Sequence, residues 1–324
     1  MHLHVVRVFS FLGGDEMKFA VIGAGVVGTA LAVRLAGAGH TCVGVHTRSS
    51  ASYARFKRYL DVPHLSLEEL VPQVELLFIT TQDSRIRSVV DYLAAAKLYG
   101  EGQVWIHCSG AYASELLRSD GLPVACLSIH PLQSFADVDT AVQLLEHTHF
   151  SVEGDRHELG CALVKDLGGI AHVISTENKA LYHAGAVLAS NYVVVLAALA
   201  TNLFELAGIK RAEALPALLP LMEGALKNLS SLGLPQALTG PLVRGDIDVV
   251  RSHLEKMPEP WANAYAALAP EALELAVWKW SENGQQYPAD VYEEFKHLIE
   301  TSLSRSPGKE IITTSAGILP GQVA

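Results

Sequence analysis

From Lys18 to about Ser175, short apolar runs rich in β-branched residues alternate with longer amphipathic stretches. The runs KFAVIG, TCVGVH, ELLFIT, VWIHCS and VACLSIH predict strands, and stretches between them such as TALAVRLAGAG and SRIRSVVDYLAAA predict helices. Strands that alternate with helices form a mostly parallel sheet covered on both faces. This part of the chain is therefore expected to be a doubly wound α/β domain.

After Ser175 the strand pattern stops, and three long stretches have helical composition and period: ENKALYHAGAVLASNYVVVLAALATNLFELAG, RAEALPALLPLMEGALKNLSSLG and WANAYAALAPEALELAVWKWS. The first of them predicts one helix from about Glu177 to Leu206. We therefore expect four segments: a disordered extension at 1–16, an α/β domain at 17–175, an all-α domain at 176–304 and a flexible tail at 305–324.

The stretch AGAVLASNYVVVLAALA, residues 184–200, carries no charge and nearly reaches the length of a membrane span. A helix that is apolar all round also suits a buried central helix or the core of a dimer. The flanking His183 and Glu205 and the interrupting Asn191 favour the second interpretation, so we expect no membrane span. We expect instead a homodimer built on the helical domain.

The formal net charge of the chain is -10. This acidic balance argues against nucleic acid or an anionic membrane as a partner, and an anionic ligand would need a local basic pocket. The four cysteines stand singly and no secretion signal is recognisable, so we expect a cytoplasmic protein. Apart from His147-x-His149, no spacing suggests a metal site, and no metal is expected.

The segment GAGVVG follows the first predicted strand and opens the first predicted helix. Gly23 permits the tight turn, Gly25 lets a pyrophosphate approach the backbone, and Gly28 lets helix and strand pack closely. The backbone N–H groups of Val26 and Val27 then face the phosphates at the helix N-terminus. A glycine-rich turn without a ligand is the alternative, but the order of strand, turn, helix and strand favours a dinucleotide site.

The second predicted strand ends in Thr47-Arg48-Ser49, at the point where NAD-binding chains carry an acidic residue. A carboxylate there would repel a 2′-phosphate, whereas a guanidinium beside hydroxyl groups makes charge-assisted hydrogen bonds to it. A solvated surface arginine is the alternative. The segment predicts NADP(H) in preference to NAD(H).

Polar residues also follow the other strands at the edge where such sheets bind ligands. We assign Thr80, Thr81 and Ser109 to the cofactor, and Gly110 and His130 to the substrate. The alternative is that residues in these positions cap helices or form turns.

Reduction of a carbonyl or imine needs a proton donor, and Lys179 and His183 are four residues apart on one face of the long helix. Polar groups there are costly unless they face a polar cleft, so we assign both to catalysis and Asn191, further along, to the substrate. The alternative is a lysine that snorkels to solvent and an interface histidine.

The segments TGP and RGD form a bent loop between helices, in which Thr239 and Arg244 are candidate substrate residues. The alternative is a structural turn in which Asp246 caps the next helix and pairs with Arg244.

Together GAGVVG, TTQD, HCSGA, SIHPLQSF, NKALYHAGAVLASN and ALTGPLVRGD resemble a reductase-like family with a Rossmann-like domain and a helical domain of unknown function. The match runs from about Met17 to Leu303. The family is similar in architecture to ketopantoate reductase, pyrroline-5-carboxylate reductase and the β-hydroxyacid dehydrogenases. The resemblance implies an α/β Rossmann domain followed by an all-α domain of the 6-phosphogluconate dehydrogenase-like type, and NAD(P)-dependent chemistry in a dimer.

The β-hydroxyacid dehydrogenases carry a K-x-x-x-N pattern, whose lysine the resemblance maps onto Lys179, while His183 replaces the asparagine. We therefore expect an NADP-dependent oxidoreductase that acts on a small polar carbonyl or imine. A non-catalytic NADP-binding sensor or interaction protein on the same fold is the alternative.

Overall fold

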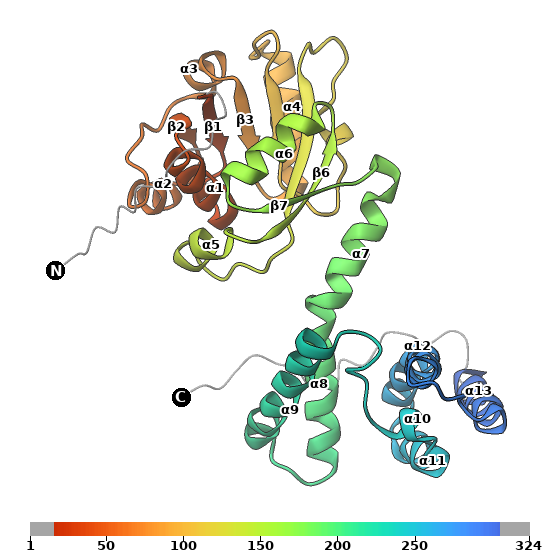
Figure 1. Cartoon of the computed structure of the whole chain (residues 1–324). Helices are drawn as coiled ribbons and strands as arrows, with labels where there is room; N and C mark the ends of the chain where they lie inside the picture. Colours follow the sequence, from red (N-terminus) through yellow and green to blue (C-terminus); the bar gives the residue numbers. More distant parts are fainter. Residues whose placement is uncertain (1–15, 305–324) are drawn as a thin grey trace. The chain divides into compact units, whose positions relative to one another are not determined.

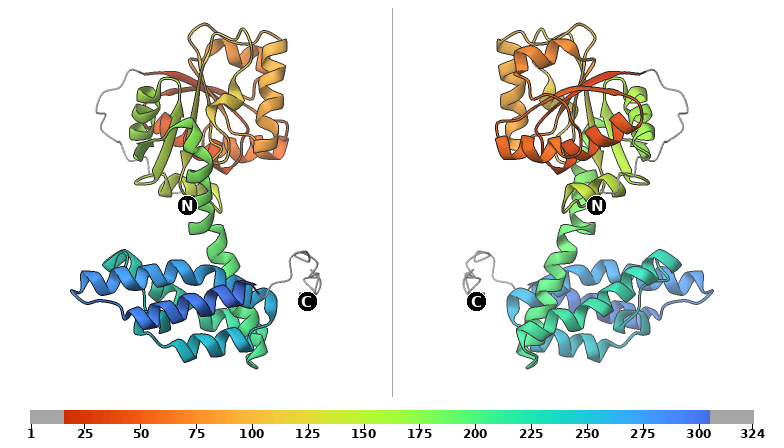
Figure 2. Two further views of the ribbon diagram at one scale, coloured as in Figure 1. Left: turned by 90° about the vertical axis from the view of Figure 1, so that its right-hand side faces the viewer. Right: turned by 90° about the vertical axis from the view of Figure 1, so that its left-hand side faces the viewer.

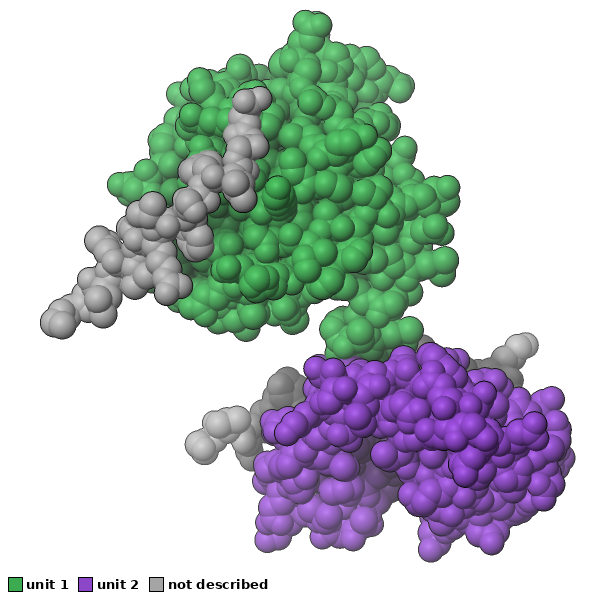
Figure 3. Space-filling model, viewed as in Figure 1, with its two compact units in different colours: residues 1–192 green, residues 193–324 purple. Residues whose placement is uncertain are grey.

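The computed structural model describes residues 16–304, which fall into two compact units, Met1–Tyr192 and Val193–Ala324 (Figure 3). The tail at 305–324 and all but the last residue of the extension at 1–16 lie outside the described residues. The first unit contains the sheet together with the helix that follows it, and the second contains helices.

Seven strands form one sheet in the described part of the first unit, in the order β2-β1-β3-β4-β5-β6-β7. They are β1 (Lys18–Ile22), β2 (Thr41–His46), β3 (Leu76–Ile79), β4 (Val104–His107), β5 (Ala125–Pro131), β6 (His149–Gly154) and β7 (Ile170–Val173). All neighbours are parallel except β5 and β6. The expected mostly parallel sheet is confirmed, and its first five strands are the five apolar runs.

Helices cover both faces of the sheet (Figure 1). On one face, α1 (Val26–Gly37), α5 (Val138–Leu144) and α6 (His157–Asp166) pack through buried aliphatic residues such as Leu31 and Leu163. The short helix α2 (Ser50–Lys57) packs on this same face through Phe56. On the other face lie α3 (Leu67–Leu70) and α4 (Asp83–Ala95), with short 3-10 turns η1 (Val71–Gln73) and η2 (Ser114–Leu117). The carboxyl ends of the five parallel strands β1 to β5 lie at one edge of the sheet, which is where such sheets bind ligands.

The long helix expected from Glu177 to Leu206 is interrupted, so that expectation is corrected. A 3-10 turn η3 (Thr176–Asn178) leads into α7 (Lys179–Ala189), and α8 (Asn191–Leu206) begins after Ser190. The Ser190 hydroxyl donates to the Ala186 carbonyl at 2.7 Å, a back-bond that competes with the helical ladder. Among the described residues, Thr176–Leu206 is the one stretch long and apolar enough to cross a membrane by length and composition.

The second unit is helical in its described part (Figure 2). After α8 come α9 (Arg211–Leu232), α10 (Pro241–Arg244), α11 (Ile247–Lys256), α12 (Glu259–Glu282) and α13 (Ala289–Ser304). Its core joins α11, α12 and α13 through residues such as Val250, Leu273 and Phe295. In contrast, α8 and α9 together bury only Thr201, Ala214 and Leu218 among the described residues, so most of their leucines and valines stay exposed.

Candidate functional site

The glycine loop between β1 and α1 is shaped by its contact with the end of β3. Gly23 has a φ of +108°, and a Cβ there would lie 2.8 Å from the Thr80 carbonyl carbon. A Cβ on Gly28 would lie 2.2 Å from Thr80 Oγ1, which itself donates to the Gly23 carbonyl at 2.8 Å. Gly25 is the N-cap of α1 and places no side chain on the first N–H groups of the helix. The loop therefore leaves these N–H groups free for an anion.

A cavity of about 740 Å³ lies against this loop. Nine of the predicted cofactor residues line it: Gly23, Gly25, Val26, Val27, Thr47, Arg48, Ser49, Thr80 and Thr81. Its wall contains two arginines, Arg48 and Arg85, and no carboxylate of the described residues, although the chain as a whole is acidic. The cavity is thus the local basic pocket that an anionic ligand would need.

Residues other than Arg48 hold the loop after β2 in place. The His64 ring contacts the Thr47 carbonyl at 2.8 Å and stacks on His46 with ring centroids 5.6 Å apart. Ser49 caps α2 by accepting the Ser52 N–H at 3.2 Å. Arg48 is exposed and makes no ion pair with any residue between 16 and 304, so its guanidinium is available to a ligand at the N-terminus of α2.

Sequence reasoning missed Arg85, which lines the same cavity from the first turn of α4. The available signal was a basic residue two positions after the strand-end segment TTQD. Tyr92, further along α4, lines the cavity beside Leu67 and Val89, and its hydroxyl donates to Glu68 at 2.5 Å. These side chains give the cavity an apolar end.

Ser109 does not line the cavity. Its hydroxyl donates to Asp83 Oδ2 at 2.8 Å and accepts the N–H groups of Ala111 and Tyr112, both at 3.2 Å. Asp83 is the first residue of α4 rather than its cap. Ser109 and Asp83 thus fix the turn that carries Gly110, and cofactor contact by Ser109 stays a prediction.

Gly110, His130 and His183 come together beyond the ends of β4 and β5. A Cβ on Gly110 would lie 2.7 Å from both His130 Nε2 and His183 Nδ1. The two imidazole rings are 6.3 Å apart and nearly perpendicular. His130 Nδ1 also contacts the Tyr182 hydroxyl at 3.0 Å, whereas His183 Nδ1 is buried without a hydrogen-bond partner among the described residues. An orphaned buried nitrogen is costly, which is typical of a position that a ligand completes.

Burial lowers the pKa of His130 to about 4, and the positive charges of Lys179 and His183 add to this effect. The His130 ring is therefore neutral near pH 7. Burial likewise raises the pKa of the nearby Cys108 thiol to about 12, which makes it unreactive.

Lys179, the first residue of α7, points into the sheet and is 2% exposed. Its Nζ donates to Ser128 Oγ of β5 at 2.8 Å and to Ser151 Oγ of β6 at 3.3 Å. Burial lowers its pKa to about 8, and the negative charge of Glu153 opposes that shift. The amine therefore loses its proton near pH 8, much closer to neutrality than an exposed lysine.

The polar side chains around Lys179 lie on one face of the sheet, in two rows of residues paired across neighbouring strands. His107, Ser128 and Glu153 are opposite one another across β4, β5 and β6, and His130 pairs with Ser151. His107 Nδ1 accepts the Ser109 N–H at 3.1 Å, so its Nε2 donates to the Ala113 carbonyl at 3.0 Å. Sequence reasoning missed Ser128, Ser151 and Glu153, because small polar residues inside a strand carry no motif.

The remaining candidates lie apart from these groups. Asn191 begins α8, is exposed and has its side-chain amide 3.0 Å from Ser190 Oγ. Thr239 and Arg244 are exposed in the second unit, where Arg244 Nε donates to Asp246 at 2.7 Å. Asp246 precedes α11 but makes no side-chain cap bond. Substrate contact by Asn191, Thr239 and Arg244 stays a prediction.

The sequence matches the family of Rossmann-like domains over residues 11–131. Over residues 148–272 it matches a domain of unknown function, DUF2520. The chain joins a Rossmann-like domain to a DUF2520 domain. The DUF2520 region begins with β6 and therefore includes Ser151, Glu153 and Lys179. No curated protein matches the sequence.

Solved structures share this fold over most of their length. Protein TM1727 from Thermotoga maritima is 24% identical with a TM-score of 0.61, and the match covers 88% of this chain and 98% of that one. A Bacteroides fragilis protein assigned as an NADP oxidoreductase is 21% identical with a TM-score of 0.62, covering 80% and 98%. A 1-pyrroline-5-carboxylate reductase from Streptococcus pyogenes is 18% identical with a TM-score of 0.51, covering 89% and 99%. The likeness confirms the Rossmann-like fold followed by a helical region.

Proposed function

We propose that the protein is an NADP-dependent oxidoreductase that reduces a small polar carbonyl or imine. The observation that carries this proposal is the cavity at the glycine loop, whose wall holds two arginines and no carboxylate. A dinucleotide with three phosphate groups suits such a wall, and the names of two similar proteins, an NADP oxidoreductase and a pyrroline-5-carboxylate reductase, point to the same chemistry.

The residues of the cavity support the placement of three parts of NADPH: the pyrophosphate, the 2′-phosphate and the adenine. The free N–H groups of Val26 and Val27 would hold the pyrophosphate at the start of α1. Arg48, with the N-terminus of α2 behind it, would hold the 2′-phosphate. The apolar end formed by Leu67, Val89 and Tyr92 suits the adenine ring. When bound, NADPH supplies the hydride that reduces the substrate carbon.

Lys179 would supply the proton in the same reaction. Its Nζ transfers a proton to the carbonyl oxygen or imine nitrogen as the hydride reaches the carbon, which leaves an alcohol or an amine and a neutral lysine. With a pKa near 8, lowered by burial, the lysine is mostly protonated at pH 7 yet readily gives up its proton. Ser128 and Ser151 would hold the amine in one direction, because each accepts one of its three N–H bonds.

Gly110, His130 and His183 would bind the polar end of the substrate. His130 is neutral near pH 7 and has one ring nitrogen on Tyr182, so its Nε2 faces the small space above Gly110. The unpartnered Nδ1 of His183 faces the same space. A polar substrate group placed there would satisfy both nitrogens, which is why we propose a polar rather than an aliphatic substrate.

We also propose that the protein is a homodimer assembled through α8 and α9. Val194 is 71% exposed and Leu221 is 69% exposed, and neither helix buries a large apolar side chain apart from Leu218. Exposed apolar surface on this scale is typical of an interface, and a second copy of the chain offers the matching surface.

Titration of the purified protein with NADPH, followed by turnover assays with small keto acids and cyclic imines, tests the proposed function. We expect saturable NADPH binding and oxidation of NADPH with at least one compound of these classes. Tight NADPH binding with no oxidation across the whole panel would favour a sensor, and no NADPH binding would refute the cofactor assignment.

A further inference from the structure

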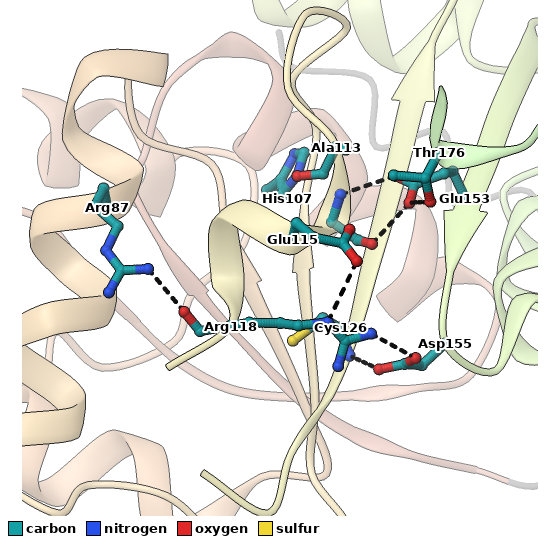
Figure 4. Close-up of polar contacts among 10 residues, drawn as sticks. Arg87, His107, Ala113, Glu115, Arg118, Cys126, Glu153, Asp155 and Thr176 are labelled. Carbon is teal, nitrogen blue, oxygen red and sulfur yellow. Dashed lines mark hydrogen bonds and ion pairs between the residues drawn. The ribbon is translucent and has the colours of Figure 1, made fainter. Parts of the chain in front are cut away.

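Glu153 of β6 is a carboxylate in the interior of the first unit, only 1% exposed. Its Oε2 accepts the Ser114 N–H at 2.8 Å, and its Oε1 accepts the hydroxyls of Ser114 at 2.8 Å and Thr176 at 2.7 Å (Figure 4). A buried carboxylate is costly unless donors surround it, and here three donors from η2 and η3 do so. The proposed reaction does not use this residue.

Glu153 is placed to act on Lys179. It lies directly opposite Ser128 in the pairing of β5 with β6, and two residues from Ser151 on the same face. These two serines are the hydrogen-bond acceptors of Lys179 Nζ. Through Thr176, Glu153 also binds the turn that leads into α7 three residues before Lys179.

In the part of the chain that the structure describes, no carboxylate acts on the lysine more strongly than Glu153. No carboxylate between residues 16 and 304 makes an ion pair with Nζ. Of the carboxylates that stabilise its charge, Glu153 acts most strongly, ahead of Asp83 on α4. The Cys108 thiol is neutral, because burial raises its pKa to about 12. His107 and His130 face it from β4 and β5, but burial lowers the pKa of each to about 4, so both are neutral. From α7 itself the Tyr182 ring faces it, with its centroid 5.6 Å from Nζ, whereas the His183 ring lies against that of His130.

We infer that Glu153 is a positioning residue for the proposed proton donor: it fixes the start of α7 through Thr176 and supplies the negative charge that keeps Lys179 protonated. The inference rests on the proposed function for the role of Lys179, but the effect of Glu153 on the lysine is measurable without turnover.

Glu153→Gln tests the charge with little change in shape. The glutamine oxygen can take the place of Oε2 and accept the Ser114 N–H. Its amide NH₂ then replaces Oε1, whose two partners are the hydroxyls of Ser114 and Thr176, and hydroxyls can turn to accept. The variant should therefore fold, which unfolding curves would check.

The measurement is an NMR titration of the full-length protein labelled with ¹³C at lysine Cε, with the Lys179 signal assigned by its loss in Lys179→Met. In the wild type the signal should titrate near pH 8, in line with the burial-lowered pKa. In Glu153→Gln the midpoint should fall by about one unit, a tenfold loss of proton affinity, because the charge that opposed desolvation is gone.

Two control variants separate charge from structure. Asp155→Asn makes the same change two residues away, where the carboxylate pairs with Arg118 outside the surroundings of Lys179, and should leave the midpoint unchanged. Thr176→Val removes the tether but keeps the charge, and should shift the midpoint much less than Glu153→Gln. An unchanged midpoint in Glu153→Gln, or an equal shift in Thr176→Val, would overturn the inference.

The pH profile of turnover separates this inference from the proposed function. If both hold, the alkaline limb of the reduction rate moves to lower pH in Glu153→Gln together with the NMR midpoint. If the NMR midpoint moves but the alkaline limb of the reduction rate does not, Glu153 still controls the charge of Lys179. Lys179 is then not the proton donor.

Discussion

Lys179 Nζ lies 2.8 Å from Ser128 Oγ, which joins the first residue of α7 to the middle of β5. The helix that leaves the sheet is thus anchored inside it by a charged side chain. An ammonium group in this position is costly, since burial favours its neutral form. A methionine of similar length would avoid that cost, so a buried lysine at this position supports the proposed role in proton transfer.

Lys179→Met should lower turnover by roughly a hundred-fold or more, because the variant keeps the shape of the side chain but has no proton to donate. NADPH affinity should stay close to that of the wild type, since Lys179 does not line the cofactor cavity. Steady-state kinetics and a cofactor titration would measure the two quantities. Lys165→Met, the same change at an exposed position of α6, is the control. Full turnover in Lys179→Met would exclude the proposed role.

The pH dependence of the two reaction directions should be opposite. The pKa of Lys179 is lowered to about 8 by burial. Reduction uses the protonated amine, so its rate should fall as the pH rises through about 8, whereas oxidation uses the neutral amine and should become faster over the same range. Rate profiles measured with saturating cofactor would show this. If the rates of reduction and of oxidation changed in the same direction as the pH rises, a single titrating proton donor would be excluded.

The residues around Lys179 explain why the sequence predicts part of the site and not the rest. The glycine loop is a local motif, so GAGVVG identifies the cavity without knowledge of the fold. In β6, the buried positions of HFSVEG include Ser151 and Glu153, which hides the apolar pattern of a strand. One of the two strands that sequence reasoning missed therefore carries Ser151, a partner of the lysine, together with Glu153.

The helix predicted from Glu177 to Leu206 shows a second limit of prediction from hydrophobic periodicity. Its apolar period continues through Ser190, yet the hydroxyl of that serine bonds to Ala186 and the helix stops there. Similarly, β7 is an edge strand with exposed Ile170 and Val173, so it lacks the continuous buried apolar run that marks the equally short β3 and β4. Such features depend on hydrogen bonds and neighbours that periodicity does not report.

Arg48→Ala should weaken NADPH binding roughly ten- to a hundred-fold and change NADH binding little, because only NADPH carries the 2′-phosphate. Calorimetric titration with both cofactors would measure the difference. Arg58→Ala removes the same charge at the C-terminal end of α2, away from the cavity, and should affect neither cofactor. Equal losses for the two cofactors in Arg48→Ala would refute the assignment of the 2′-phosphate site.

Gly110→Ala should reduce turnover by at least about ten-fold at unchanged NADPH affinity. The added Cβ would lie 2.7 Å from a nitrogen of each of two imidazoles, so His130 and His183 must move apart. Gly37→Ala is a matched control in α1, where a Cβ meets no atom within 4 Å. Wild-type kinetics in Gly110→Ala would show that the space between the two histidines is not part of the substrate site.

Val194→Glu should convert the protein from a dimer to a monomer, or to aggregates where the exposed leucines remain uncovered. Val194 is 71% exposed on α8, so a glutamate is tolerated in an isolated chain and is costly only in a covered interface. Val249→Glu places the same charge on the exposed face of α11 and should leave the assembly intact. Sedimentation velocity would compare the three proteins over a range of concentrations. A wild-type chain that sediments as a stable monomer would contradict the proposed dimer, because the apolar faces of α8 and α9 would then remain in water.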